Sequence, residues 1–162
     1  MADERRLVLS SPPGPLLLAA DDLGLTRVRL LAGPLSDDAR VRSDDALLRE
    51  AAGQLTAYFA GRLRRFDLPL HPAGTPFQLR VWAALREIPY GETRSYKDVA
   101  LAAGSPRGFR AVGMANHCNP LLIVTPCHRV IAADGGLRGF ACGLECKRFL
   151  LRLERENILK TV

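Results

Sequence analysis

The 162-residue chain has few aromatic residues, little lysine and no long apolar run. Only 6% of its residues are aromatic, so its core must consist mostly of leucine, valine and alanine. No apolar run approaches the roughly 18 residues of a membrane-spanning helix, and we expect no contact with a membrane. The chain starts with the charged segment MADERR, which does not fit a signal peptide. The apolar stretch at residues 16–20 is too short, and lies too far along the chain, to be the apolar core of one. We therefore expect a cytoplasmic protein.

Cysteine is absent from residues 1–74, and the second half contains no C-x-x-C motif. The cysteines are Cys118, Cys127, Cys142 and Cys146. A zinc site formed by Cys118, Cys127, His117 and His128 is one reading, although the usual ligand spacings are missing. Thiols stay reduced in the cytoplasm, which favours the other reading, four free thiols and no metal.

Charge is distributed unequally between the two halves. Residues 1–74 contain ten arginines, no lysine and ten acidic residues, so they are neutral. The net charge of +6 therefore belongs to residues 75–162, which contain 13 basic and seven acidic residues. With 48% hydrophobic and 25% charged residues the chain is typical of a globular protein. A basic second half indicates a polyanionic partner.

The first half predicts a small sheet and one helix. Three short strands are expected at residues 7–9, 15–19 and 25–31, separated by the turn segments SPPG and ADDLG. Ser43 is the expected cap of a helix whose first turn contains Asp44 and Asp45, and Gly61 ends this helix. Residues 65–70 are expected to add a strand. The segment HPAGTP, residues 71–76, is the predicted domain boundary.

The second half begins with helix signals. Thr75 and Pro76 are typical of a helix start. A short helix is predicted at residues 95–103, ended by Gly104, and another at residues 105–117. Two short helices joined by a glycine turn form a helix-turn-helix, although an ordinary helical hairpin is the alternative. A strand at 121–124, a turn at 134–136 and a helix at 143–157 are expected to follow.

Cys127 is the residue most suited to covalent chemistry. It follows Pro126 at the end of the expected strand, and His128 and Arg129 come next. A thiol reacts as its thiolate, which a neighbouring imidazole or cation promotes. Because neighbours on an extended chain point in opposite directions, a bridging water is expected between Cys127 and His128. The alternative for such a cysteine is a small buried hydrophobic residue.

Several segments together resemble the O6-alkylguanine-DNA alkyltransferases. The segment TPCHRVI, residues 125–131, resembles the active-site signature of that family. Four further segments match in order: FQLRVWAALREIPYGETRSY (77–96), RAVGMAN (110–116), NP (119–120) and KRFLLRLE (147–154). The first half fits the variable N-terminal domain of the family more loosely.

The resemblance implies an α+β protein with two domains. Residues 1–74 would form a small ribonuclease-H-like α/β scaffold, with a short antiparallel sheet and a helix. Residues 75–162 would form a mainly helical, winged-helix-like domain that contains the helix-turn-helix, binds DNA and performs alkyl transfer.

The resemblance also implies a set of catalytic roles. Cys127 would attack the alkyl carbon on guanine O6, chiefly a methyl group, in an SN2 step. His128 would act as the base through water, and Glu154 would orient the imidazole. Asn119 would brace the turn, and Tyr96 would contact the 3′ phosphate and protonate guanine N3. The S-alkyl cysteine has no route of removal, so each molecule would act once and need no cofactor.

DNA contacts follow from the same resemblance. Arg110 would enter the base stack in place of the flipped guanine. Ser95, Tyr96, Arg107, Ala111, Gly113 and Arg129 complete the expected DNA-binding set. The expected substrate pocket consists of Val130, Phe140, Ala141 and Cys142. The partner would be duplex DNA bound through its minor groove by a monomer, and O4-alkylthymine is a further expected substrate.

Two other functions remain as alternatives at this stage. A catalytically silent alkyltransferase-like lesion sensor would lack the reactive cysteine, which is present here. A cysteine hydrolase would use Cys127 and His128 for many turnovers and would need no DNA.

Overall fold

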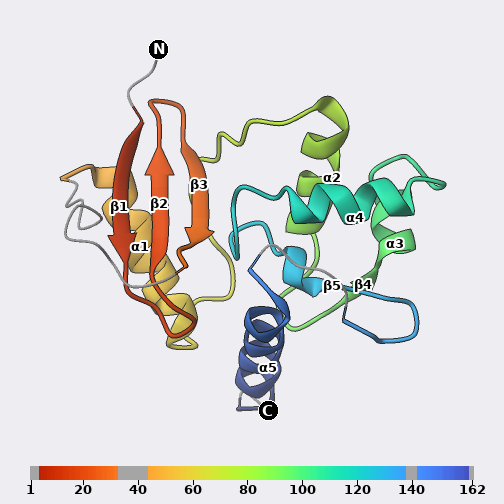
Figure 1. Ribbon diagram of the computed structural model, residues 1–162. Helices are drawn as coiled ribbons and strands as arrows, with labels where there is room; N and C mark the ends of the chain where they lie inside the picture. Colours follow the sequence, from red (N-terminus) through yellow and green to blue (C-terminus); the bar gives the residue numbers. More distant parts are fainter. Residues whose placement is uncertain (1–3, 33–43, 138–141, 161–162) are drawn as a thin grey trace. The chain divides into compact units, whose positions relative to one another are not determined.

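The computed structural model describes residues 4–32, 44–137 and 142–160 (Figure 1). The chain divides into two compact units, Met1–Ala73 and Gly74–Val162. This division lies one residue from the boundary predicted inside HPAGTP. Within the described ranges, no helix has both the length and the apolar character needed to cross a membrane.

The first unit is a three-stranded antiparallel sheet in the order β1-β2-β3 with one helix. Strands β1 (Arg5–Leu9), β2 (Leu16–Ala20) and β3 (Leu25–Leu30) agree with the predicted strands to within two residues. Every residue of the central strand β2 is buried. Helix α1 (Ala46–Phe59) lies beside the sheet and contacts β1 and β2 (Figure 1). The low aromatic content is thus compatible with a core of leucine and alanine.

Two predictions for this unit were wrong. Asp45 caps α1 by accepting a hydrogen bond from Leu48 N, so the cap is not Ser43, which lies outside the described residues. Residues 65–70 form no strand beyond a single parallel bridge between Leu25 and Leu70. Leu25 N donates to Pro69 O at 2.8 Å, but proline has no N–H with which to extend a ladder.

The second unit begins as the sequence predicts. Helix α2 (Pro76–Arg86) has a capping box between Thr75 and Gln78. Trp82 is fully buried, and its indole N–H donates to Ala115 O at 2.9 Å. This bond fastens α2 to α4 (Phe109–His117), the helix that follows the glycine turn.

The helix-turn-helix is present with a later second helix than predicted. Helix α3 (Tyr96–Ala102) ends two residues before Gly104, whose φ of +76° suits glycine. Residues 105–108 form a turn closed by Gly108 N donating to Ser105 O at 2.8 Å. The Ser105 carbonyl accepts this hydrogen bond of the turn instead of the first bond of an α-helix. Helix α4 therefore starts at Phe109 rather than at Ser105.

The predicted strand at residues 121–124 is instead a pair of tight turns. Val124 N donates to Leu122 O at 2.8 Å, and Thr125 N donates to Leu121 O at 2.9 Å. Ile123 has a φ of +72°, which is costly for a β-branched residue. The segment is apolar because it is buried. Its apolar composition is also typical of a buried strand, so the prediction of a strand was wrong.

The chain then enters the part that contains Cys127. A 3-10 helix η2 (Cys127–Arg129) leads into β5 (Val130–Ile131), which pairs in parallel with β4 (Arg94–Ser95). The turn at residues 134–136 is present. Helix α5 (Leu144–Lys160) closes the unit and runs three residues beyond its predicted end. The α+β class is confirmed.

Candidate active site

The thiol of Cys127 is held by the side-chain amide of Asn119. Cys127 is completely buried, and Asn119 Nδ2 lies 3.1 Å from its sulfur. The same amide nitrogen donates to Thr125 O at 2.8 Å, and Asn119 Oδ1 accepts from Leu121 N at 3.0 Å. One side chain therefore ties together both arms of the turn and contacts the sulfur.

A buried histidine–carboxylate pair follows directly in the chain. His128 Nε2 lies 2.6 Å from Glu154 Oε2, and both side chains are at most 1% exposed. An ionised carboxylate only accepts hydrogen bonds, so Nε2 carries the proton. Nδ1 of His128 is then an acceptor, and it is buried without a hydrogen-bond partner. The imidazole is thus arranged to receive a proton.

Both carboxylate oxygens of Glu154 accept hydrogen bonds. Arg129 Nε donates to Oε1 at 2.8 Å, and Arg129 Nη2 donates to Oε2 at 3.0 Å. Gly91 N also donates to Oε1 at 3.1 Å. Burial alone would raise the pKa of Glu154, but the hydrogen bonds and charges of His128 and Arg129 outweigh burial and hold this pKa well below its usual range.

Arg129, which was predicted to bind DNA, is paired with buried groups in the structure. It is only 6% exposed, and Nη1 donates to Ile88 O at 2.8 Å. Its guanidinium also lies 5.6 Å from the centre of the Tyr90 ring. An arginine in a basic half of the chain suggests phosphate contact, and only the fold shows that its partner is Glu154, 25 residues away.

Burial controls the protonation of the reactive pair. It raises the pKa of the Cys127 thiol to about 12, opposed by the Asn119 hydrogen bond and the charge of Lys147. Burial also lowers the pKa of His128 below its ordinary 6.5, opposed by Glu154. The site at neutral pH therefore holds a neutral thiol and a neutral imidazole rather than an ion pair.

Lys147 is a site residue that the sequence analysis missed. Its side chain is 1% exposed, and Nζ donates to Val130 O at 2.6 Å. Burial lowers its pKa, and the neighbouring Cys127 opposes this shift. The carbonyl of Val130, expected to contact the substrate, keeps one lone pair beyond this bond. A buried lysine on an amphipathic helix gives no signal in the sequence.

The rest of the predicted pocket is only partly described. Phe140 and Ala141 lie outside the described residues. Cys142 is half-buried and bonded to Cys146, with their Cα atoms 5.9 Å apart. The prediction of four free thiols was therefore wrong, because a spacing of four residues at the start of α5 brings these two together. The free cysteines are Cys118, which is exposed, and Cys127. No cluster of three or more potential metal ligands occurs among the described residues.

Apart from Arg129, the predicted DNA-binding residues lie on α3, on α4, at the cap of α3 or in the turn between the two helices. Ser95 caps α3, and Tyr96 is its half-buried first residue. Tyr96 Cε1 lies 4.0 Å from the position that a Cβ at Gly113 would occupy. The exposed residues of the set are Arg107, Arg110 and Ala111. His117 is the exposed last residue of α4, where the predicted helix also ends.

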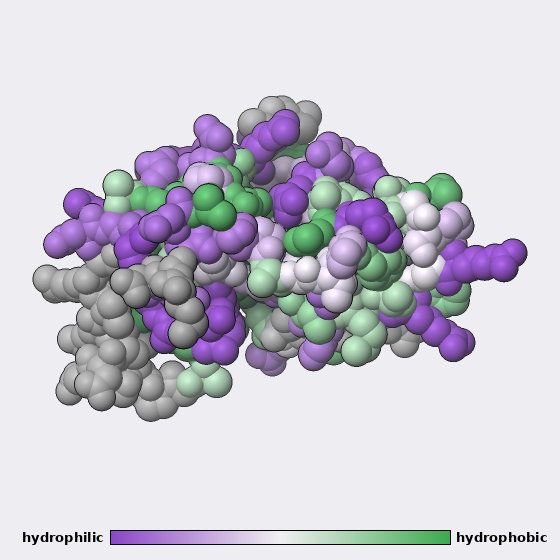
Figure 2. All heavy atoms as spheres, turned by 90° about the horizontal axis from the view of Figure 1, so that it is seen from above, coloured by the Kyte–Doolittle hydropathy of each residue, from purple (hydrophilic) through white to green (hydrophobic). Residues whose placement is uncertain are grey.

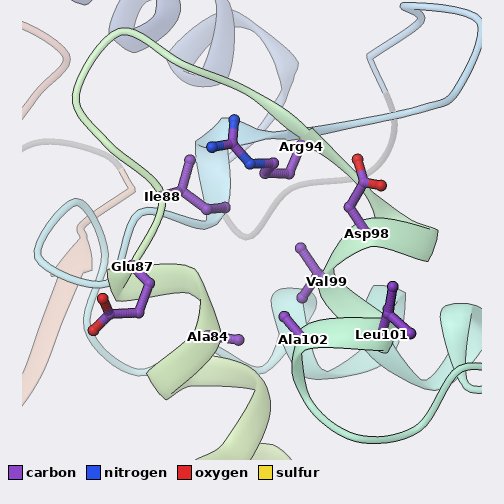
Figure 3. Close-up of a pocket in the computed structure, with 8 residues that line it drawn as sticks. All are labelled: Ala84, Glu87, Ile88, Arg94, Asp98, Val99, Leu101 and Ala102. Carbon is purple, nitrogen blue, oxygen red and sulfur yellow. The ribbon is translucent and has the colours of Figure 1, made fainter.

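Cys127 is not among the lining residues of two cavities formed by described residues of the second unit. One, of about 420 Å³, is formed by α2, β4 and α3, with Glu87, Asp98 and Leu101 among its lining residues (Figure 3). The other, of about 160 Å³, reaches Glu154. In the view of Figure 2 the most hydrophobic residues form small groups, and pale green and white spheres cover much of the right-hand side. The reactive sulfur is thus buried beneath protein atoms.

Comparisons with known proteins agree with this geometry. Residues 76–156 match the family model "6-O-methylguanine DNA methyltransferase, DNA binding domain", and residues 5–72 match its ribonuclease-like domain. The methylated-DNA--protein-cysteine methyltransferase of Methanosarcina barkeri is 52% identical, over 93% of this chain and 97% of its own. Its counterpart in Mycobacterium bovis is 48% identical, over 92% and 91%.

Solved structures show the same relationship. The O6-methylguanine methyltransferase of Mycobacterium tuberculosis superposes with a TM-score of 0.85 and 46% identity, over 96% of this chain and 94% of that one. The OGT protein of the same organism in complex with DNA gives a TM-score of 0.84 at the same identity, over 94% of both chains. The chain belongs to the 6-O-methylguanine DNA methyltransferase family.

Proposed function

We propose that this protein repairs DNA by moving the alkyl group of O6-alkylguanine, chiefly methyl, onto Cys127. The observation that supports this most directly is the buried thiol, held at 3.1 Å by Asn119 and followed in the chain by a histidine paired with Glu154 at 2.6 Å. This arrangement occurs in a chain that matches the DNA-binding domain of the family over residues 76–156.

The bond changes balance without a cofactor. The Cys127 sulfur forms a bond to the alkyl carbon while the bond from that carbon to guanine O6 breaks. The thiol proton passes to His128 Nδ1, directly or through a water, and Glu154 stabilises the resulting imidazolium. Tyr96 supplies the proton that the departing guanine needs at N3, and solvent then returns a proton to Tyr96 and removes the extra proton from His128. Arg129 and Gly91 hold Glu154 in place.

The reaction is expected to occur once per molecule. A thioether has no good leaving group at neutral pH, and a second thiol would have to attack its carbon. Cys142 and Cys146 are joined to each other, and Cys118 is exposed whereas Cys127 is buried. No described cysteine is therefore arranged to regenerate the thiol.

DNA is the partner, and the alkylated base must leave the duplex to reach the buried sulfur. Arg110, exposed on α4, fills the resulting gap in the base stack. We further propose that a monomer binds through the minor groove, which offers little sequence information, and that O4-alkylthymine is also accepted. The silent-sensor alternative is not favoured because Cys127 is present, and the hydrolase alternative is not favoured because the relatives are methyltransferases.

Intact-protein mass spectrometry tests this function. After incubation with duplex DNA containing O6-methylguanine, the protein should gain a single methyl group, about 14 Da, covalently attached at the nucleophile. Cys127→Ser should gain nothing, and the matched variant Cys118→Ser should behave as the wild type. Repeated turnover, or no gain of mass by the wild type, would reject single-use transfer.

The pH dependence of transfer tests the neutral thiol–imidazole pair. Because burial lowers the pKa of His128 below 6.5, the imidazole stays neutral in mildly acidic solution. The single-turnover rate with free O6-benzylguanine should therefore be constant from about pH 8 to about pH 6.5 and decline only at lower pH. The free base is used because its reaction does not include the pH dependence of DNA binding.

The same shift has a consequence for stability. A histidine whose pKa is lower in the folded than in the unfolded chain binds its proton preferentially in the unfolded chain. The stability that neutral His128 contributes is fully present above pH 6.5, the ordinary pKa of histidine, and falls as the pH decreases toward the pKa of His128 in the folded protein.

In the rate experiment, a transfer rate that halves near pH 6.5 or above, while the protein is still folded, would contradict a neutral buried imidazole.

A further inference from the structure

Helix α4 has an exposed face with one large apolar side chain near its centre. Val112, Ala115 and Asn116 are buried against the rest of the unit. On the opposite side, Arg110, Met114 and His117 recur at i, i+4 and i+7, the spacing of one helix face. All three are exposed, and Met114 is 65% exposed. DNA that approaches α4 from this side must meet Met114.

The neighbours of Met114 make this side chain prominent. Gly113 has no side chain, and Ala111 is small and exposed. The thioether of Met114 therefore projects beyond the small side chains on this part of the helix. Single exposed apolar residues are common, so the argument depends on the position of Met114 on the helix.

That position is beside the arginine proposed to enter the base stack. Four residues of α-helix span about 6 Å, which is less than two base-pair steps of about 3.4 Å. The Arg110 guanidinium lies 6.0 Å from the Phe109 ring, and Lys97 Nζ lies 5.8 Å from the same ring. Two cations thus flank the start of α4, where their charge attracts the DNA backbone. Met114, one turn further along, is placed to contact the groove itself.

We propose that Met114 is an apolar wedge that packs against sugar and base edges of the duplex beside the flipped nucleotide. This inference rests on the proposed function. Proteins that bind the minor groove often insert such side chains, including methionine, and the contact offsets part of the cost of unstacking. Met114 then acts with Arg110 to hold the duplex open, and it takes no part in the bond-forming step at Cys127.

The first test compares two substrates in the full-length protein. Met114→Ala should slow transfer from duplex O6-methylguanine by roughly 5- to 50-fold, because a wedge contact contributes on the order of base unstacking. Transfer from free O6-benzylguanine should remain within about twofold of the wild type, because this reaction does not open a duplex. The matched control is Leu101→Ala, which removes another exposed apolar side chain, 67% exposed, from α3.

The second test reads the contact directly. The chain has only two methionines, so mild oxidation with hydrogen peroxide can be followed at Met114 by peptide mass spectrometry as a gain of about 16 Da. Duplex DNA should protect Met114 from oxidation. Unchanged duplex transfer by Met114→Ala, faster transfer, or unprotected Met114 in the complex would each overturn the wedge. A wild type that does not react with duplex DNA would instead refute the proposed function.

Discussion

Replacement of Glu154 by glutamine is expected to slow transfer to Cys127 by a factor on the order of 10² to 10⁴, the range of general acid–base catalysis. The carboxylate fixes the proton on His128 Nε2 and stabilises the imidazolium when Nδ1 receives the thiol proton. Glutamine keeps the shape but loses the charge. Single-turnover rates with free O6-benzylguanine measure this effect without a contribution from DNA binding.

The same variant is expected to lose about 3–5 kcal/mol of unfolding free energy, because it leaves the buried charge of Arg129 without a partner. Denaturant unfolding measures this loss. Adding Arg129→Met should recover part of the stability and leave transfer slow. If transfer recovered together with stability, Glu154 would be only a structural anchor. Glu156→Gln, an exposed change on the same helix, is the matched control and should alter neither quantity.

Replacement of Asn119 by aspartate is expected to slow transfer by about 100-fold, because a small misplacement of a reacting group costs about this much. The two side chains have the same shape, but aspartate cannot donate to Thr125 O or to the Cys127 sulfur. Its negative charge beside the sulfur would also oppose formation of the thiolate. Time courses of the intact-protein mass measure the rate.

Stability should decrease as well, by about 1–3 kcal/mol for buried partners left unsatisfied. Asn157→Asp offers a matched control. Asn157 lies on α5, and its Nδ2 donates to Tyr90 Oη at 3.0 Å rather than to the thiol. We expect near-normal transfer from this control. Wild-type rates for Asn119→Asp would show that the amide does not position the sulfur.

Local signals explain the elements that the sequence predicted well. The capping box at Thr75 and the glycine stop at Gly104 act within a few residues, so each could be recognised in the sequence. The errors at residues 65–70 and 121–124 have a common origin. A short apolar segment is compatible with any buried conformation, and its hydrogen-bond partners decide which one forms.

The active site shows the same limit. Cys127, His128, Asn119 and Glu154 were named through a resemblance in their order, and the fold brings Asn119 to the sulfur and Glu154 to the imidazole. The partner of Arg129 and the burial of Lys147 have no signal in their own neighbourhood. The four-residue spacing of Cys142 and Cys146 is a local signal for their disulfide, but the expectation of reduced thiols argued against it.

The unequal distribution of charge and cysteine and the helix-turn-helix could be predicted from the sequence alone, which also singled out Cys127 as the candidate nucleophile. Each of these depends on composition or on residues close in sequence. Which cations are exposed and which are buried could not be predicted from the sequence. Arg110 and Arg129 are both arginines, but Arg110 is exposed on α4 whereas Arg129 is buried and paired with Glu154. Long-range packing makes that distinction, because burial and the pairing of distant charges exist only after the chain has folded.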